Sequence, residues 1–145
     1  MLTERLAPTC GSIDAVDTSA AMLVVLDRKV EREGWNHVST GRSVPADGPA
    51  YDLIVCSSVC SFVDDYPATA AELAHRLLPG GLFVQWDWER DPEVEGEDGL
   101  SRSEISTALA AAGLDSIDVG TGFEQAIGNV TMRPLMGIGR RPKPG

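Results

Sequence analysis

The sequence has few basic residues and a clear excess of acidic ones. It contains 12 Lys and Arg against 22 Asp and Glu, which gives a formal net charge of −10 at pH 7. No nucleic acid and no membrane is therefore expected as a partner, because DNA, RNA and anionic lipid surfaces all require a basic face that displaces counterions. The sequence also lacks an apolar run of about 18 residues, so it predicts no membrane span.

Cysteine and histidine are also scarce. The three cysteines are Cys10, Cys56 and Cys60, and there are two histidines. An odd number of cysteines, together with an N-terminus that lacks the pattern of a signal peptide, indicates a reducing compartment and predicts a cytoplasmic protein. We interpret Cys56 and Cys60 as small buried residues, because no histidine lies near them in the sequence. No metal site is predicted.

The order of apolar segments predicts an α/β fold. A chain of 145 residues, 43% of them hydrophobic, is expected to form a single domain, residues 1–145. Strand patterns alternate with helical patterns, which is typical of a mostly parallel sheet with flanking helices. The last two strands have no helix between them and predict an antiparallel hairpin at one edge. The predicted strands are Ile13–Val16, His37–Thr40, Leu53–Cys56, Leu82–Trp88, Ile117–Val119 and Thr131–Gly139.

Turn and cap residues predict where the helices begin and end. The first helix is expected at residues 1–7, before Pro8. The second is capped by Thr18 or Ser19 and followed by Gly34. The third begins at Pro67, includes Leu77 and Leu78 on its apolar face, and is ended by "PGG" at residues 79–81. The fourth opens with the capping box "SRSE" at residues 101–104, runs to about Ala112 and stops at Gly113.

The stretch "SIDAVDTSAAML" places a carboxylate directly after the first strand. Ligands of open α/β sheets bind beyond the carboxyl ends of the strands, and a carboxylate there can accept hydrogen bonds from both hydroxyls of a ribose. The same position also suits an acid that favours the start of a helix. The residues themselves leave both interpretations of Asp17 open.

Two further strands end in polar residues. Ser57 and Ser58 follow the apolar segment "LIVC", and Gln85 and Asp87 lie in "LFVQWDW". These positions predict that the polar residues share one edge of the sheet. Asp87 is a candidate base or substrate contact.

Three segments, taken together, resemble the class I S-adenosylmethionine-dependent methyltransferases that act on small molecules. "IDAVDTSAAMLVVLDRKV" is similar to the second strand of that family and the helix that follows it. "YDLIVCSSVCSFVDDYPATAAELAHRLLPGGLFVQWDWE" is similar to its fourth strand, the next helix and the fifth strand. "EISTALAAAGLDSIDV" is similar to its last helix and sixth strand. The resemblance implies a Rossmann-like fold, S-adenosylmethionine as cofactor, and methyl transfer to a small-molecule acceptor.

The resemblance also implies roles for individual residues. Asp17 would hold the ribose, and Thr18 would lie against the adenine. Arg42 and Ser43 would lie at the edge of the adenine, and Ser57 and Ser58 would face the methionine portion. Methyl transfer depends chiefly on holding donor and acceptor in line, so a dedicated base is optional.

The sequence departs from this family at its beginning. The glycine-rich loop and the first strand of the family have no counterpart, so we expect a shortened form of the domain with weak cofactor binding. Ile13–Val16 and Leu53–Cys56 would flank the first strand in the family. Here they are expected to pair directly with each other or to be bridged by a second molecule in a homodimer.

Two other classes of protein remain as alternatives. A non-catalytic binding or interaction module would keep the fold and use exposed strand edges as a partner surface. A nucleotide-dependent oxidoreductase could also use an acid at the end of a strand, but its glycine fingerprint is absent. The "LLPGG" arrangement favours the methyltransferase.

Overall fold

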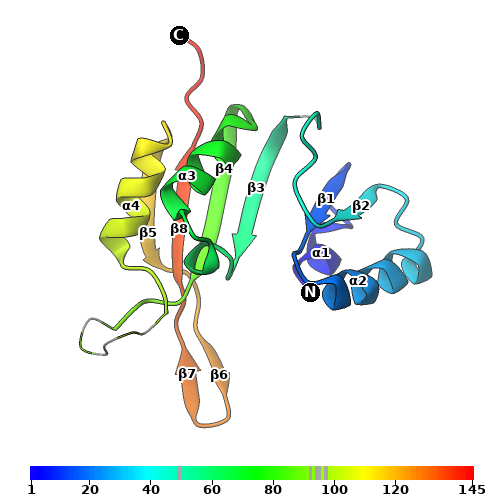
Figure 1. Ribbon diagram of the computed structural model, residues 1–145, viewed down its shortest axis with the longest axis horizontal. Helices are drawn as coiled ribbons and strands as arrows, with labels where there is room; N and C mark the ends of the chain where they lie inside the picture. Colours follow the sequence, from blue (N-terminus) through cyan, green and yellow to red (C-terminus); the bar gives the residue numbers. More distant parts are fainter. Residues whose placement is uncertain (49, 92, 94–95, 97) are drawn as a thin grey trace. The chain divides into compact units, whose positions relative to one another are not determined.

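The computed structural model describes residues 1–48, 50–91, 93, 96 and 98–145. The acidic segment 89–99 therefore lies partly outside the described residues. The chain forms two compact units, Met1–Gly48 and Pro49–Gly145, and Figure 1 shows their elements. The single domain expected from the length of the chain stays a prediction.

The first unit is a pair of parallel strands connected by a helix. Its elements are α1 (Leu2–Leu6), β1 (Ile13–Val16), α2 (Ala20–Glu33) and β2 (Val38–Gly41). Ser19 caps α2 by accepting a hydrogen bond from the backbone N–H of Met22, and Gly34 ends the helix in the left-handed conformation at φ 68°. Both ends of α2 are therefore where the cap residues predict them.

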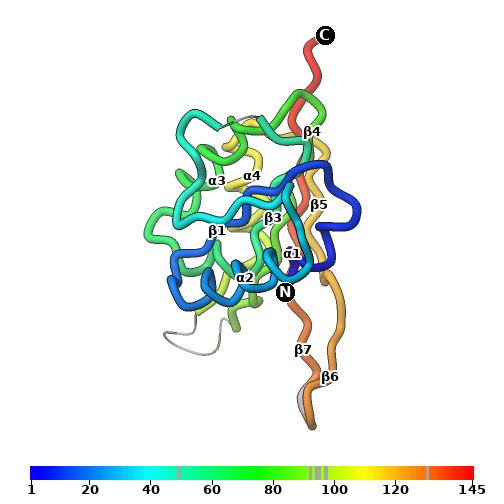
Figure 2. Tube along the Cα trace, turned by 90° about the vertical axis from the view of Figure 1, so that its right-hand side faces the viewer, coloured from blue at the N-terminus to red at the C-terminus, as the bar shows by residue number. Residues whose placement is uncertain are grey.

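The second unit is a four-stranded sheet with two helices on one face. The strand order is β3 (Tyr51–Ser57), β4 (Leu77–Asp87), β8 (Leu135–Arg140) and β5 (Asp115–Thr121). β3 and β4 are parallel, whereas β8 runs antiparallel to both β4 and β5. The helices α3 (Tyr66–His75) and α4 (Arg102–Ala111) lie on the same side of this sheet in both views (Figures 1 and 2).

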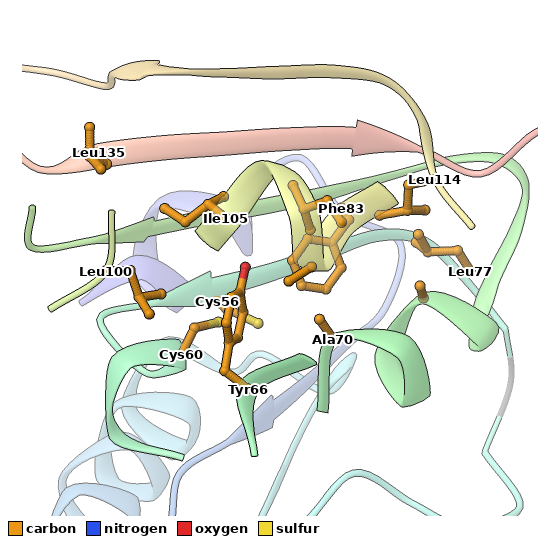
Figure 3. Close-up of a cluster of buried hydrophobic side chains, with 13 residues drawn as sticks. Cys56, Cys60, Tyr66, Ala70, Leu77, Phe83, Leu100, Ile105, Leu114 and Leu135 are labelled. Carbon is orange, nitrogen blue, oxygen red and sulfur yellow. The ribbon is translucent and has the colours of Figure 1, made fainter. Parts of the chain in front are cut away.

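The core of the second unit lies between this sheet and its helices. Side chains from β4, α3 and α4 meet there, as Figure 3 shows, and Phe83, Ile105 and Leu109 have no exposed surface. A short 3-10 helix, η1 (Cys60–Phe62), connects β3 to α3. Beyond the sheet, β6 (Gln125–Ile127) and β7 (Val130–Met132) form a projecting hairpin (Figure 1).

The sequence places several elements incorrectly in the second unit. Leu77 and Leu78 belong to β4 and not to α3, because α3 ends at His75 and the "PGG" segment continues the strand. The predicted strand Thr131–Gly139 is divided into β7 and β8 around Arg133 and Pro134, and proline has no N–H for a ladder. By contrast, β5 and β8 form the predicted antiparallel pair at one edge of the sheet, with β8 between β4 and the edge strand β5.

The predicted direct pairing of the strands at Ile13–Val16 and Leu53–Cys56 would join the two units, and it stays a prediction because each unit is described by itself. Within the described residues of its own unit, β1 is hydrogen-bonded to β2, and β3 is hydrogen-bonded to β4. In each of these two strands, the backbone groups along one edge are therefore hydrogen-bonded. The homodimer that would bridge the other edges stays a prediction.

α4 approaches β8 very closely at a glycine. A Cβ atom built on Gly137 would lie 2.5 Å from Ile105 Cγ2, whereas a Cβ atom on Gly120 of β5 would meet nothing within 4 Å. Neither glycine has a positive φ. The absence of a side chain at Gly137 therefore allows the helix to pack against the sheet.

We predict that Gly137→Ala lowers the free energy of unfolding by about 1–3 kcal/mol, because the added methyl group overpacks the contact with Ile105. Urea denaturation measures the change. Gly120→Ala is the matched control and should be neutral or slightly stabilising. Equal stability of the two variants would show that this contact is not tight.

Candidate functional site

The first part of the candidate site lies at the carboxyl ends of β1 and β2. Val16 and Gly41 are partners in the parallel register, so the chain leaves both strands at the same edge. The backbone N–H of Asp17 donates to the carbonyl of Gly41 at 3.1 Å, and Arg42 Nη2 donates to the carbonyl of Thr18 at 3.1 Å. The structure therefore brings Asp17, Thr18 and Arg42 together.

These side chains are open to solvent. Asp17, Thr18, Arg42 and Ser43 are all exposed. A hollow of about 40 Å³ lies beside them on the strand pair, lined in part by Ser43. This volume is little more than that of one water molecule. The first unit by itself therefore offers contacts to a ligand but does not enclose one.

The Asp17 carboxylate has one oxygen engaged and one open. Asp17 Oδ1 accepts a hydrogen bond from the backbone N–H of Ser19 at 2.8 Å, immediately before α2. This contact shows that Asp17 supports the start of the helix. Among the described residues, no hydrogen bond reaches Oδ2, so that oxygen remains available for a ligand. The two interpretations of Asp17 are compatible.

The second part of the candidate site lies at the carboxyl end of β3. Ser57 is the last residue of the strand and is exposed. Ser58 adopts a left-handed conformation at φ 52°, which is unusual for a residue other than glycine. Its backbone N–H donates to the carbonyl of Trp86 at 2.8 Å, which fixes the turn against β4.

Asp87 lies at the end of the neighbouring strand β4 and is fully buried. Asp87 Oδ1 accepts a hydrogen bond from the backbone N–H of Ser61 at 3.1 Å, and Oδ2 accepts one from Gln85 Nε2 at 3.0 Å. Gln85 is also fully buried, and its Oε1 accepts a hydrogen bond of 2.6 Å from the Tyr66 hydroxyl. These residues form a continuous buried chain of hydrogen bonds, which we call the Tyr66–Gln85–Asp87 relay.

Burial changes the acid–base properties of this region. Burial raises the pKa of Asp87 above its ordinary value, and the hydrogen bonds from Ser61 and Gln85 oppose that change. Burial also raises the pKa of Tyr66. The neighbouring Cys56 side chain, together with burial, raises the pKa of the Cys60 thiol. Figure 3 shows the two sulfur atoms beside Tyr66.

The structure places the predicted residues in two groups. Asp17, Thr18, Arg42 and Ser43 lie together in the first unit, and Ser57, Ser58 and Asp87 lie at neighbouring strand ends in the second. A pocket shared by Asp17 and Ser57 stays a prediction, since each unit is described by itself. The role of Asp87 as a base also stays a prediction, and its complete burial gives a solvent-borne acceptor no direct access to the carboxylate.

Sequence reasoning missed Tyr66 and Ser61. The available signal was the alternation in β4, where Gln85 and Asp87 share the face of Phe83. Polar side chains on a buried face require partners. The sequence could therefore have indicated that partners exist, but not which residues they are.

A hollow of the second unit lies at the other ends of the helices. Its volume is about 310 Å³, and its lining includes His75 at the end of α3, Gly113 after α4, and Arg141. Arg141 Nη1 already donates hydrogen bonds to the carbonyls of His75 and Leu77. This hollow is separate from the polar strand ends.

Neither a cluster of metal ligands nor a membrane-spanning helix is found among the described residues. Across the part of the chain that the structure describes, no group of three or more His, Cys, Asp or Glu side chains could hold a metal ion. No helix in the same residues is both long and apolar enough to cross a membrane.

Comparison with known proteins identifies the family. A family model described as a methyltransferase domain matches residues 1–83. The chain therefore belongs to the methyltransferase-domain family, which confirms the resemblance stated from the sequence. A curated relative from Azorhizobium caulinodans, named N-(5'-phosphoribosyl)anthranilate isomerase, is 32% identical over 123 residues. The match covers 78% of this chain and 54% of the relative, so the chain spans about half of that protein.

Solved structures confirm the Rossmann-like fold. The N-methyltransferase NodS from Bradyrhizobium japonicum WM9 has a TM-score of 0.73 at 23% identity, covering 97% of this chain and 79% of NodS. The YcgJ protein from Bacillus subtilis has a TM-score of 0.76 at 14% identity, with coverages of 98% and 87%. A methyltransferase from Clostridium acetobutylicum has a TM-score of 0.72 at 15% identity, with coverages of 97% and 79%.

The raised pKa of Asp87 predicts how stability depends on pH. Between its ordinary pKa near 3.8 and its raised value, the folded protein binds more protons than the unfolded chain. The contribution of this group to the free energy of unfolding is therefore largest in acid and falls as the pH rises through that interval. Asp87→Asn removes the titration, so the stability of the variant relative to the parent should rise from about pH 4 upward.

Urea denaturation of both proteins at several pH values measures this effect. The loss of a hydrogen-bond acceptor lowers the stability of Asp87→Asn at every pH. The test is therefore whether the difference in free energy of unfolding between the variant and the parent changes with pH. Asp64→Asn, at an exposed position, is the control and should run parallel to the parent. A pH-independent difference for Asp87→Asn would contradict the raised pKa.

Proposed function

We propose that the protein is an S-adenosylmethionine-dependent methyltransferase that acts on a small-molecule acceptor. The observation that carries this proposal is the open Oδ2 of Asp17, held at the carboxyl ends of β1 and β2 in a chain of the methyltransferase-domain family. A carboxylate in that position suits the two hydroxyls of a ribose. One structural neighbour, NodS, has been solved in complex with S-adenosyl-L-homocysteine, which supports the choice of cofactor.

The cofactor contacts that we propose follow the two groups of polar residues. Asp17 would bind the ribose, while Thr18, Arg42 and Ser43 would contact the adenine. Ser57 and Ser58 would contact the methionine portion. The residues fit such a ligand because they are exposed or half-buried polar groups at strand ends. When bound, S-adenosylmethionine supplies the methyl group.

The properties of the acceptor rest on charge and on the neighbours. The net charge of −10 disfavours nucleic acid and anionic lipid. Neighbours include an N-methyltransferase and a protein of an O-methyltransferase family, which supports a nitrogen or oxygen nucleophile. Burial of Asp87 favours catalysis by alignment of donor and acceptor over catalysis by that carboxylate. The three free cysteines support action in the cytoplasm.

The second candidate is a cofactor-free interaction module. It is favoured by β1 and β3, each of which has a single hydrogen-bonded neighbour among the described residues of its own unit. Such strand edges can accept another strand. The isomerase name of the relative from A. caulinodans receives no support from any observation on the described residues. Cofactor binding separates the two candidates, because the interaction module would bind none.

Asp17→Asn tests the proposed ribose contact. Asparagine keeps one side-chain oxygen for the Ser19 N–H but replaces the open carboxylate oxygen by an amide and removes the charge. We expect the affinity for S-adenosyl-L-homocysteine to fall about 10- to 100-fold, as for the loss of a charged hydrogen-bond acceptor. Isothermal titration calorimetry measures the affinity.

Glu31→Gln is the control for the loss of charge, because Glu31 is an exposed residue of α2. It should leave the affinity unchanged, and both variants should keep the melting temperature of the parent. Unchanged binding by Asp17→Asn would mean that Asp17 acts at the helix start alone. Failure of the parent to bind would contradict the methyltransferase proposal.

A further inference from the structure

The segment after β3 is held in an unusual shape. Ser57 ends the strand, Ser58 has a left-handed backbone, and η1 begins at Cys60. We call residues 57–62 the β3–α3 turn. It carries the two serines proposed to contact the methionine portion of the cofactor. A non-glycine residue keeps φ near 52° only when its surroundings impose that conformation.

β4 supplies the contacts that impose this conformation. The backbone N–H of Ser58 donates to the carbonyl of Trp86 at 2.8 Å. The backbone N–H of Ser61 donates to the Asp87 carboxylate at 3.1 Å. The first contact is backbone to backbone and needs no particular side chain. The second depends entirely on the orientation of the Asp87 side chain.

The orientation of Asp87 is fixed in turn by Gln85 and Tyr66. The Tyr66 hydroxyl donates to Gln85 Oε1, so the Gln85 amide nitrogen is directed at Asp87 Oδ2. Tyr66 is the first residue of α3 and follows the β3–α3 turn along the chain. The hydrogen bonds thus connect the first residue of α3, through β4, to Ser61 within the turn.

Burial makes this arrangement specific. Gln85 and Asp87 have no exposed surface, and Tyr66 is 7% exposed. Water therefore has little access to replace a partner that is removed. The Asp87 carboxylate selects the amide orientation of Gln85, since an inverted amide would direct its oxygen at the carboxylate. The Tyr66 hydroxyl then donates to the amide oxygen and holds the Gln85 side chain in place.

We propose that Tyr66, Gln85 and Asp87 are positioning residues that hold the β3–α3 turn, and with it Ser57 and Ser58, in a cofactor-binding shape. The assignment of the turn to the cofactor rests on the proposed function. The hold on the turn rests on the hydrogen bonds alone. Asp87 acts through the Ser61 backbone and is not a base in this account.

Tyr66→Phe tests the relay from its far end. The variant removes one oxygen, two hydrogen bonds away from Asp87, and leaves the residues of the turn unchanged. We expect hydrogen exchange of the Ser61 amide, measured by NMR on the full chain without ligand, to accelerate about tenfold, as for the loss of one hydrogen bond. We expect the dissociation constant for S-adenosyl-L-homocysteine to rise by about fivefold or more.

Leu114→Ala is the control for general destabilisation. Leu114 belongs to the same core and packs beside Gly139, at the other end of the sheet from the relay. It should lower the melting temperature at least as much as Tyr66→Phe does. The exchange rate of the Ser61 amide, relative to the rates of other amides of the sheet, should be the same as in the parent. The affinity for S-adenosyl-L-homocysteine should also be unchanged.

A double variant provides an independent measurement. If the three residues act as one relay, Tyr66→Phe with Asp87→Asn should alter Ser61 exchange by no more than the larger single change. Additive changes, or unchanged Ser61 exchange in Tyr66→Phe, would overturn the relay. If the parent binds no S-adenosyl-L-homocysteine, the proposed function fails, and the exchange data still decide whether the relay holds the turn.

Discussion

The buried face of β4 is the constraint on which the second unit depends. Phe83, Gln85 and Asp87 alternate along the strand, so they point to the same face, and none of them is exposed. Phe83 needs only close packing there. The amide and the carboxyl need hydrogen bonds as well, because an unsatisfied buried polar group is costly. The start of α3 at Tyr66 and the turn that presents the Ser61 N–H meet this requirement.

Packing of α4 on the other part of the sheet depends on the close fit of apolar side chains against glycines. Gly137 of β8 faces Ile105, and Gly139 faces Leu114. The helix and its following turn occupy the space that side chains on the strand would fill. The same unit therefore combines a region set by shape, at α4 and β8, with a region set by hydrogen bonds, at α3 and β4.

The polar strand ends show how one residue can serve both the fold and a ligand. Asp17 uses one oxygen to support the start of α2 and keeps the other open. Asp87 uses both oxygens inside the protein. The two carboxylates therefore differ in exposure, although each lies at or directly after the carboxyl end of a parallel strand. This difference directs the proposed cofactor contact to Asp17 and the proposed positioning role to Asp87.

Local chemistry determined the parts of the fold that the sequence predicts well. β1 has the predicted bounds, Ser19 and Gly34 delimit α2, and Ser101 and Glu104 form the predicted capping box. Each of these features depends on residues within a few positions of one another. The family resemblance followed from the order of such segments, and the family match confirms it.

Tertiary structure decided the features that depend on distant residues. Leu77 could belong to a helix or a strand by pattern, and pairing with Tyr51 of β3 places it in β4. The insertion of β8 between β4 and β5 depends on β4–β8 pairs that lie between 48 and 58 positions apart in the sequence, from Asp87↔Leu135 to Leu82↔Arg140. The sequence identified Asp87 as a polar strand end. Its burial, and its connection to Tyr66 and Ser61, arise only when α3 and the β3–α3 turn pack against β4, because hydrogen-bond partners are chosen by proximity in space.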